Sequence, residues 1–223
     1  MDLAEALRSR LAPHADPERA RAQQAYLKTT LPMMGLTRPT QGSVFRAFLK
    51  EHPPADRAAW EAGARALWAG PERDLKYAAV EWVKGFRGRY LDLQAIPLIE
   101  AMIREGAWWD LVDDLAANAV GPIVLAHREA MRPVLDRWIA DPDLWIRRTA
   151  ILAQLKHREA TDLEQLFAFC LRQADDRTFW IRKAIGWALR QHARTNPAAI
   201  RAFLALHGAR FSGLTRREAS KHL

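Results

Sequence analysis

The chain has 223 residues, a net charge of +8 with neutral histidines and a pI near 10.1, and 49% of its residues are hydrophobic. This composition is typical of a folded protein and excludes an intrinsically disordered chain. Its 40 alanines and 27 leucines outnumber the 26 valines, isoleucines and threonines together, which favours helices over sheets. No uninterrupted apolar run approaches the roughly 20 residues that span a bilayer.

The cysteine content and the N-terminus indicate the cellular environment. The single cysteine, Cys170, excludes an internal disulfide and any site built from several cysteines. Residues 1–5 include two acids where a secretory signal needs a basic start and an apolar core. We therefore expect a cytoplasmic protein with no membrane segment, no metal and no other cofactor. The positive charge favours an anionic partner, most commonly nucleic acid, although many basic proteins bind none.

Turn and cap residues divide the chain into about a dozen short amphipathic helices. The first predicted helices cover about 17–31, 41–51 and 56–69, and glycine or proline follows each of them. Further along, Thr161 with Glu164 and Thr215 with Glu218 have the spacing of capping boxes. Asn196 followed by Pro197 predicts an N-cap and a first helical residue. Short helices with short connections predict an antiparallel helical stack.

A repeat becomes visible when three tryptophans are aligned. Trp109 and Trp145 are 36 residues apart, and Trp145 and Trp180 are 35 apart. A period of this length with two helices in each repeat is typical of a helical solenoid. The sequence therefore predicts an all-α fold of about six helical pairs, forming a single domain over 1–223, with one helix of each pair lining a concave surface.

The aligned tryptophans share a helical face with charged residues. Arg148 and Lys183 follow the aligned tryptophan by three positions, Asp113 by four and Trp187 by seven. These spacings lie on one side of a helix, and a stripe that mixes rings with charges indicates a binding surface. Two alternatives remain open. Asp113 and Arg148 can form a structural salt bridge between neighbouring repeats, and tryptophans at helical spacing are usually core, as we expect for Trp60, Trp68, Trp82 and Trp138.

The absence of several motifs limits the kinds of reaction that the chain could catalyse. The seven histidines show no metal-binding spacing, and no phosphate-binding loop or nucleophile motif is present. What remains is a set of rings and a carboxylate beside cations. That set suits the departure of a cationic base from a sugar, because an N3- or N7-alkylated purine needs no protonation to leave. A nearby carboxylate stabilises the oxocarbenium-like transition state, and indole rings attract the cation.

The residues that carry the stripe also resemble a known family. Three segments, 108–113, 144–151 and 179–190, are similar to the AlkD-like DNA alkylation repair enzymes, which are glycosylases built from HEAT-like repeats. The resemblance implies a right-handed superhelical solenoid with a concave DNA-binding face, and catalysis without a pocket that encloses the base. It also implies that Asp113 is catalytic, that Trp109 and Trp187 flank the lesion, and that Arg148 contacts DNA. Residues 31–43 depart from the family pattern, which affects the DNA contacts expected from the first repeat.

The sequence therefore predicts a monofunctional DNA N-glycosylase that acts as a monomer on double-stranded DNA in base excision repair. It would excise positively charged N3- or N7-alkylpurines such as 3-methyladenine and 7-methylguanine. The predicted catalytic set is Asp113, Trp109 and Trp187. The predicted DNA-binding set is Arg148, Trp145, Arg182, Lys183 and Arg190. The alternative is a non-catalytic helical-repeat module that binds nucleic acid or protein through its concave face, and Asp113 discriminates between the two.

Overall fold

A computed structural model describes residues 2–223, and every regular element in that range is a helix. The predicted all-α fold is therefore confirmed. The chain divides into two compact units, one ending at Leu91 and one spanning Asp92–Leu223; a single domain over 1–223 stays a prediction. Among the described residues, no helix combines the length and the apolar character needed to cross a membrane.

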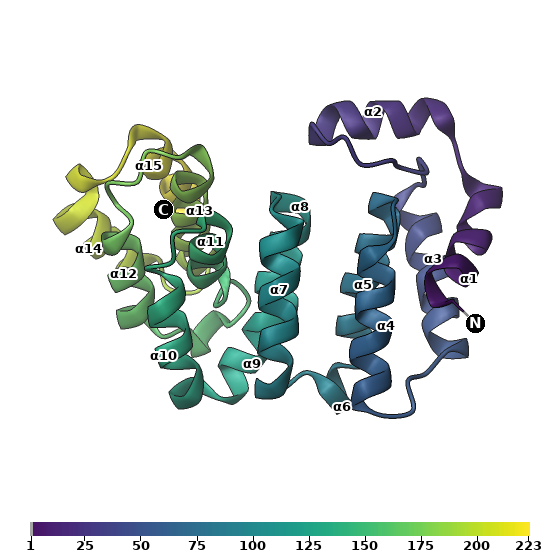
Figure 1. Cartoon of the computed structure of the whole chain (residues 1–223). Coiled ribbons are helices and arrows are strands. Elements are labelled where there is room, and N and C mark those ends of the chain that lie inside the picture. Colours follow the sequence, from purple (N-terminus) through teal and green to yellow (C-terminus); the bar gives the residue numbers. More distant parts are fainter. Residues whose placement is uncertain (1) are drawn as a thin grey trace. The chain divides into compact units, whose positions relative to one another are not determined.

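The first unit is made of six α-helices (Figure 1). They are α1 Leu3–Leu11, α2 Pro17–Leu27, α3 Arg38–Glu51, α4 Arg57–Ala69, α5 Arg73–Gly85 and α6 Arg87–Tyr90. Helix α2 ends four residues earlier than predicted because Lys28 adopts a left-handed conformation with φ 51°. Helix α3 begins three residues earlier than predicted because the side chain of Thr37 caps it.

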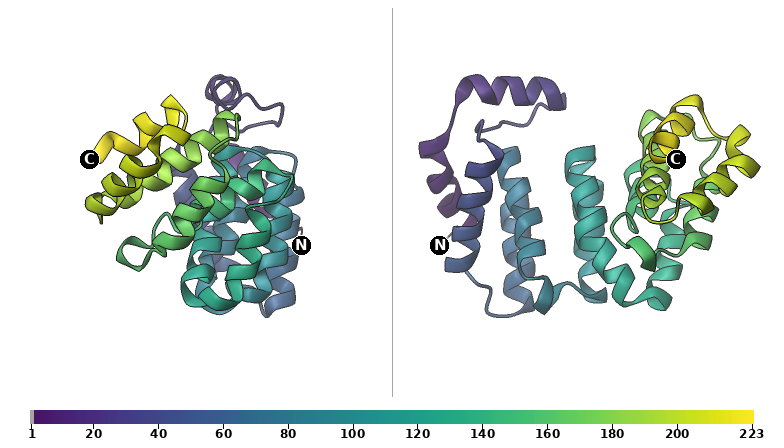
Figure 2. Two further views of the ribbon diagram at one scale, coloured as in Figure 1. Left: turned by 90° about the vertical axis from the view of Figure 1, so that its left-hand side faces the viewer. Right: turned by 180° about the vertical axis from the view of Figure 1, so that it is seen from behind.

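Helix α2 lies across the upper ends of α3 and α5 in the view of Figure 1 (see also Figure 2), and the loop after it is firmly held. The buried carboxylate of Asp74 on α5 accepts hydrogen bonds from the backbone N–H of Met34 at 2.8 Å and the side-chain amide of Gln41 at 3.0 Å. Gly35 has φ 74°, and a side chain there would meet the carbonyl oxygen of Asp16. The segment that departs from the family pattern is thus tied down inside the first unit.

The second unit carries all the predicted site residues. Its α-helices are α7 Ile96–Gly106, α8 Trp109–Leu115, α9 Gly121–Ala126, α10 Arg128–Trp138, α11 Leu144–Leu152, α12 Leu163–Arg172, α13 Phe179–Ala193, α14 Pro197–His207 and α15 Gly213–Ala219. Helix α11 packs against α8 and α13, and α13 packs against α15. The repeat inferred from the tryptophan spacing therefore corresponds to neighbouring helices.

The helices α8 and α9 form one helical run that is interrupted by a π-helical turn at Ala116–Val120. Pro122 explains this interruption, since its ring nitrogen cannot donate to the carbonyl four residues earlier and its ring crowds that carbonyl. The π turn begins three residues after Asp113. The π turn therefore lies on the same helical run as the predicted catalytic carboxylate.

The structure tests the three helix caps that the sequence predicted. Asn196 caps α14 as predicted, with its side chain accepting from the N–H of Ala199. The two capping boxes are wrong. Asp162 rather than Thr161 caps α12, and Ser212 rather than Thr215 caps α15. In both cases a better-placed oxygen one or three residues away accepts the backbone N–H.

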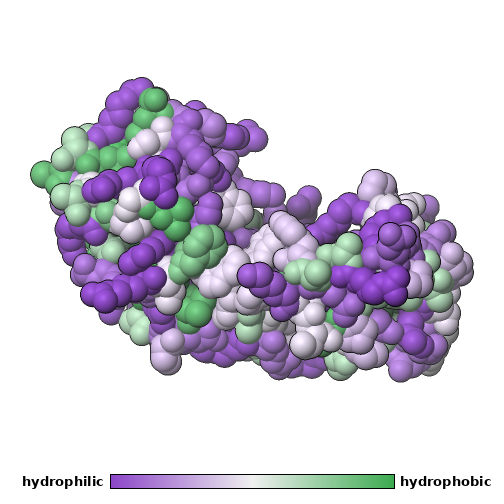
Figure 3. Space-filling model, turned by 90° about the horizontal axis from the view of Figure 1, so that it is seen from above, coloured by the Kyte–Doolittle hydropathy of each residue, from purple (hydrophilic) through white to green (hydrophobic). Residues whose placement is uncertain are grey.

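The tryptophans predicted for the core are all buried: Trp60, Trp68, Trp82 and Trp138. Cys170 is also fully buried, and burial raises the pKa of its thiol, which makes it unreactive. On the face drawn in Figure 3, hydrophilic residues cover most of the surface and hydrophobic residues form small scattered patches.

Candidate functional site

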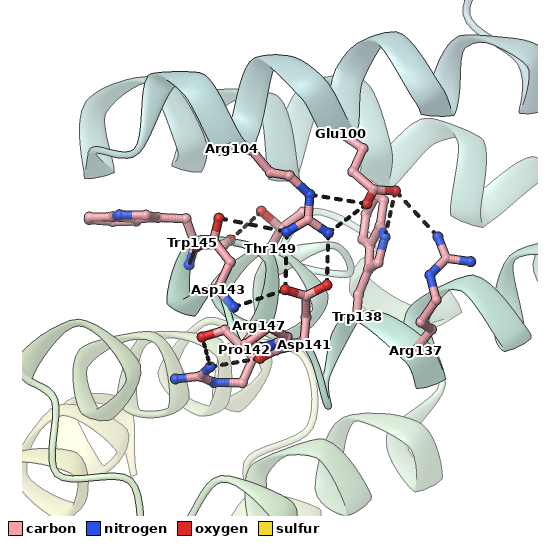
Figure 4. A network of polar contacts seen from close by, with 10 residues as sticks. All are labelled: Glu100, Arg104, Arg137, Trp138, Asp141, Pro142, Asp143, Trp145, Arg147 and Thr149. Carbon is pink, nitrogen blue, oxygen red and sulfur yellow. Dashed lines mark hydrogen bonds and ion pairs between the residues drawn. The ribbon is translucent and has the colours of Figure 1, made fainter.

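The site is built at the start of α11, where a polar network positions the helix (Figure 4). Glu100 and Arg104 on α7 form an ion pair at 2.7 Å, and Arg104 also binds Asp141 in the loop before α11 at 2.7 Å. Asp141 accepts from the N–H of Asp143, and Asp143 in turn caps Trp145 at the first turn of α11. The network therefore sets the position of α11 relative to α7, one turn before Arg148.

In two neighbouring repeats, an equivalent arginine holds the loop that precedes its own helix. Arg147, two residues after Trp145, donates to the backbone carbonyl of Asp141 at 2.7 Å. Arg182, two residues after Trp180, donates to the backbone carbonyl of Asp176 at 3.1 Å. Arg147 also binds the Asp176 carboxylate at 3.1 Å, and so links the two repeats.

Arg182 differs from Arg147 in how many of its nitrogens are used. Only its Nε is bonded, and its two terminal nitrogens have no partner among the described residues. The predicted DNA-binding residue is therefore held at its base and keeps two donors free.

Asp113 and Arg148 form the centre of the predicted stripe. Arg148 Nε and Nη2 donate to the two carboxylate oxygens of Asp113 at 2.7 and 2.8 Å. The remaining terminal nitrogen, Nη1, donates to the backbone carbonyl of Trp180 at 2.5 Å. One guanidinium thus joins α8, α11 and α13. The side chain of Arg148 is 4% exposed and that of Asp113 is 14% exposed.

This arrangement differs from the expectation for Arg148. We expected it to be the strongest phosphate contact, but in the structure it is buried and all three of its donor nitrogens are engaged within the protein. The structure therefore shows it holding Asp113, as the salt-bridge alternative anticipated. Its contact with DNA stays a prediction.

Burial dominates the electrostatics of Asp113. Burial raises the pKa of its carboxyl, and the hydrogen bonds and charge of Arg148 offset that effect only in part. The neighbouring acids Asp110 and Asp114 add to the rise. The carboxylate is therefore a largely desolvated anion beside a fixed cation, on a side chain that is 14% exposed.

The aromatic part of the stripe divides into a packed cluster and two partly exposed rings. Trp108, Trp145 and Trp180 pack together with ring centroids 5.3–5.8 Å apart. Trp145 is 7% exposed, so the structure places it in this packing and not on the open surface that we expected. Trp109 and Trp187 are partly exposed. They are the rings of the predicted catalytic set, and their roles stay predictions.

The other predicted cations gather on a residue that sequence reasoning gave another role. Lys183 and Arg190 on α13 bind the Glu218 carboxylate at 3.0 and 2.6 Å. Lys221, which was not predicted, binds it at 2.7 Å. The spacing from Thr215 suggested a capping role for Glu218, and no local pattern shows that α15 returns to α13. Among the residues that the structure describes, no three histidine, cysteine or acidic side chains gather as a metal site.

Comparison with known proteins shows the family of this chain. A family model described as DNA alkylation repair enzyme matches residues 7–223. The chain belongs to this family. A solved structure, a predicted DNA alkylation repair enzyme from Enterococcus faecalis, is similar with a TM-score of 0.87 and 27% identity, over 94% of this chain and 97% of that chain. No curated protein matches.

Membership places the chain among the enzymes of DNA alkylation repair and accounts for its helical-repeat fold. It supports DNA as the partner, and it agrees with the resemblance carried by the tryptophan, aspartate and arginine motifs. The reaction and the lesions require a separate argument from the chemistry of the site.

Proposed function

We propose that this member of the family is a monofunctional DNA N-glycosylase that releases positively charged N3- or N7-alkylated purines. The observation that carries the proposal is the side chain of Asp113, which is 14% exposed and whose carboxylate is held in place by Arg148. A glycosylase that releases a cationic base uses such a carboxylate to stabilise the positive charge that develops on the sugar. A protein that only binds DNA has no such charge to stabilise.

The proposed reaction breaks the bond between the sugar C1′ and the base nitrogen. The electron pair leaves with the base and neutralises its positive charge, so no general acid is required. The sugar acquires oxocarbenium character, which the Asp113 carboxylate stabilises electrostatically in a partly desolvated site. A water molecule then attacks C1′, and its proton passes to Asp113 or to solvent.

The rings and cations have complementary roles in this proposal. Trp109 and Trp187 are partly exposed and attract the cationic nucleotide through their faces. Arg182, Lys183 and Arg190 bind phosphates, while Trp145 packs against Trp108 and Trp180 in the aromatic cluster. Arg148 positions the carboxylate. Because the leaving group must carry its own charge, we expect slow release of neutral lesions such as uracil or hypoxanthine.

One observation favours a second candidate function, a non-catalytic module that binds DNA. Both carboxylate oxygens of Asp113 are paired with Arg148, and this pair joins α8 to α11. A purely structural salt bridge has the same geometry. The two functions differ in whether Asp113 affects base release beyond its effect on stability.

The test is single-turnover release of 7-methylguanine from duplex DNA by the Asp113→Asn variant. We expect a loss of about a hundredfold or more, the usual size of an electrostatic contribution at a reacting centre. The matched control is Asp136→Asn on the exposed face of α10, which makes the same change in charge. Asp113→Asn leaves the buried charge of Arg148 without its anionic partner, which lowers stability. Rates are therefore measured well below each variant's melting temperature.

Three results would contradict the proposal. An unchanged rate in Asp113→Asn would show that this carboxylate takes no part in the reaction. Failure of the parent protein to release 7-methylguanine, with duplex binding retained, would leave the binding module as the better function. Release of uracil by the parent at a rate comparable to that of 7-methylguanine would overturn the mechanism, since a neutral base needs a proton donor.

A further inference from the structure

Glu218 is an acid surrounded by three cations. It lies on α15, and its carboxylate accepts from Lys183 at 3.0 Å, from Arg190 at 2.6 Å and from Lys221 at 2.7 Å. Lys183 and Arg190 belong to α13, whereas Lys221 follows α15. The four side chains together carry a charge of +2.

The exposure of these side chains is strongly asymmetric. The side chain of Glu218 is 9% exposed, while those of Lys183, Arg190 and Lys221 are 36%, 24% and 50% exposed. The carboxylate therefore lies beneath the cations, which keep an open side toward solvent. Hydrogen bonds from Lys221 and Lys183 lower the pKa of Glu218 to about 2, so it stays ionised.

The cluster flanks one of the predicted catalytic rings. Lys183, Trp187 and Arg190 are spaced by four and three residues on α13, so they share a helical face. Gly186 permits the close approach of α15, because a side chain there would lie 2.5 Å from the Cβ of Glu218. Glu218 is thus held where it reaches the cations on both sides of Trp187.

We propose that Glu218 is a positioning residue that builds a phosphodiester-binding site from Lys183, Arg190 and Lys221. The inference rests on the proposed function in that the ligand is the DNA backbone beside the lesion. Long basic side chains lose conformational entropy when they bind phosphate. A buried carboxylate that has already ordered them removes part of that cost and leaves two net positive charges.

If Glu218 has only a neutralising role, its replacement changes the affinity for DNA in the opposite direction. The sign of that change therefore separates the two roles. If Glu218 only neutralises nearby cations, replacing it with glutamine adds one positive charge and tightens DNA binding. If Glu218 positions the cations, the same replacement weakens binding although the net charge rises.

The experiment measures the affinity of the Glu218→Gln variant for an undamaged, fluorescently labelled duplex over a range of salt concentrations. We expect binding weaker by about threefold or more and a log–log salt slope less steep by about one unit, as for one lost phosphate contact. The matched control is Glu164→Gln on α12, which makes the same charge change at an exposed residue and should not weaken binding. Tighter binding and a steeper slope in Glu218→Gln would overturn the proposal.

A second variant covers the case in which Glu218→Gln does not fold. Lys221→Gln changes a half-exposed side chain near the C-terminus, and its matched control is Arg201→Gln on the exposed face of α14. We expect Lys221→Gln to weaken binding and reduce the slope by about one unit relative to Arg201→Gln. Equal affinities of these two variants for the duplex would contradict the proposed phosphodiester-binding site.

These measurements use DNA without a lesion, so they do not depend on base release. If the parent protein binds the duplex but releases no 7-methylguanine, the glycosylase proposal fails and the phosphodiester site can still be confirmed. If base release is normal and Glu218→Gln binds more tightly, only the positioning role fails.

Discussion

Asp113 and Glu218 are both carboxylates bound to basic side chains, yet their pKa values move in opposite directions. For Asp113, burial outweighs the contribution of Arg148 and the pKa is raised. For Glu218, three cations that remain partly in solvent outweigh burial and the pKa falls to about 2. The first suits a carboxylate that acts on a developing positive charge, and the second suits a permanent anchor for cations.

His192 is a buried titratable residue that the proposed reaction does not use. It lies on α13, and neither ring nitrogen has a hydrogen-bond partner among the described residues. Burial lowers its pKa below 6.5, and the charge of Glu159 opposes this effect. The folded protein therefore binds a proton to His192 less readily than the unfolded chain does.

We predict that His192 makes the protein less stable in mild acid. As pH falls through the unfolded value of about 6.5, the unfolded state takes up the proton first and the free energy of unfolding decreases. Denaturant unfolding at about pH 7.5 and about pH 5.5 measures this loss, which should be smaller in His192→Gln. The same loss in parent and variant would assign it to other groups, such as His157, whose pKa burial also lowers.

At the scale of helices, the contact between α13 and α15 depends on a glycine. A Cβ at Gly186 would lie 2.5 Å from the Cβ of Glu218 and 3.0 Å from the carbonyl oxygen of Thr215. The second neighbour is backbone and cannot move without shifting α15. The helix pair that organises the cationic cluster is therefore closely packed at this point.

We predict that Gly186→Ala lowers the free energy of unfolding by about 1–3 kcal/mol, the usual cost of overpacking. The clash outweighs the gain in helix propensity that alanine brings in a helix interior. The control is Gly208→Ala, because a Cβ there meets nothing within 4 Å. Thermal or denaturant unfolding measures both variants, and equal stability of Gly186→Ala and the parent would show that α15 can shift freely.

At the scale of the whole molecule, the charge of +8 is large for a chain of 223 residues. Several arginines of the second unit form ion pairs within the protein, as for Arg104, Arg147 and Arg148. The cations that remain open to solvent are the ones that determine affinity for DNA. Net charge alone therefore overstates the number of phosphate contacts.

We predict that binding of the intact protein to undamaged duplex weakens steeply with salt. Each neutralised phosphate contributes about −0.9 to the log–log slope, so Arg182 and the net charge of +2 around Glu218 would together give about −2.7 or steeper. Fluorescence anisotropy across a salt series measures the slope. A slope near zero would contradict phosphate binding and would favour a protein partner for the basic surface.

The sequence by itself determined the helical class, the repeat and the residues of the central stripe. Helix propensity and short-range periodicity are local properties, so the burial of Trp60 and Trp138 and the cap at Asn196 could be predicted. The tryptophan period also placed Asp113 and Arg148 on one stripe in neighbouring repeats, and it left the salt bridge open as an alternative.

Only the tertiary structure decided how those residues are used. The burial of Arg148 depends on the carbonyl of Trp180, and that of Trp145 on the rings of Trp108 and Trp180; no local pattern contains that information. The role of Glu218 depends on α15 returning to α13 at Gly186. Spacing along the chain defines the helical face on which a side chain lies. The partners and the burial of that side chain are set by segments about 30 residues away, because repeats place such segments side by side.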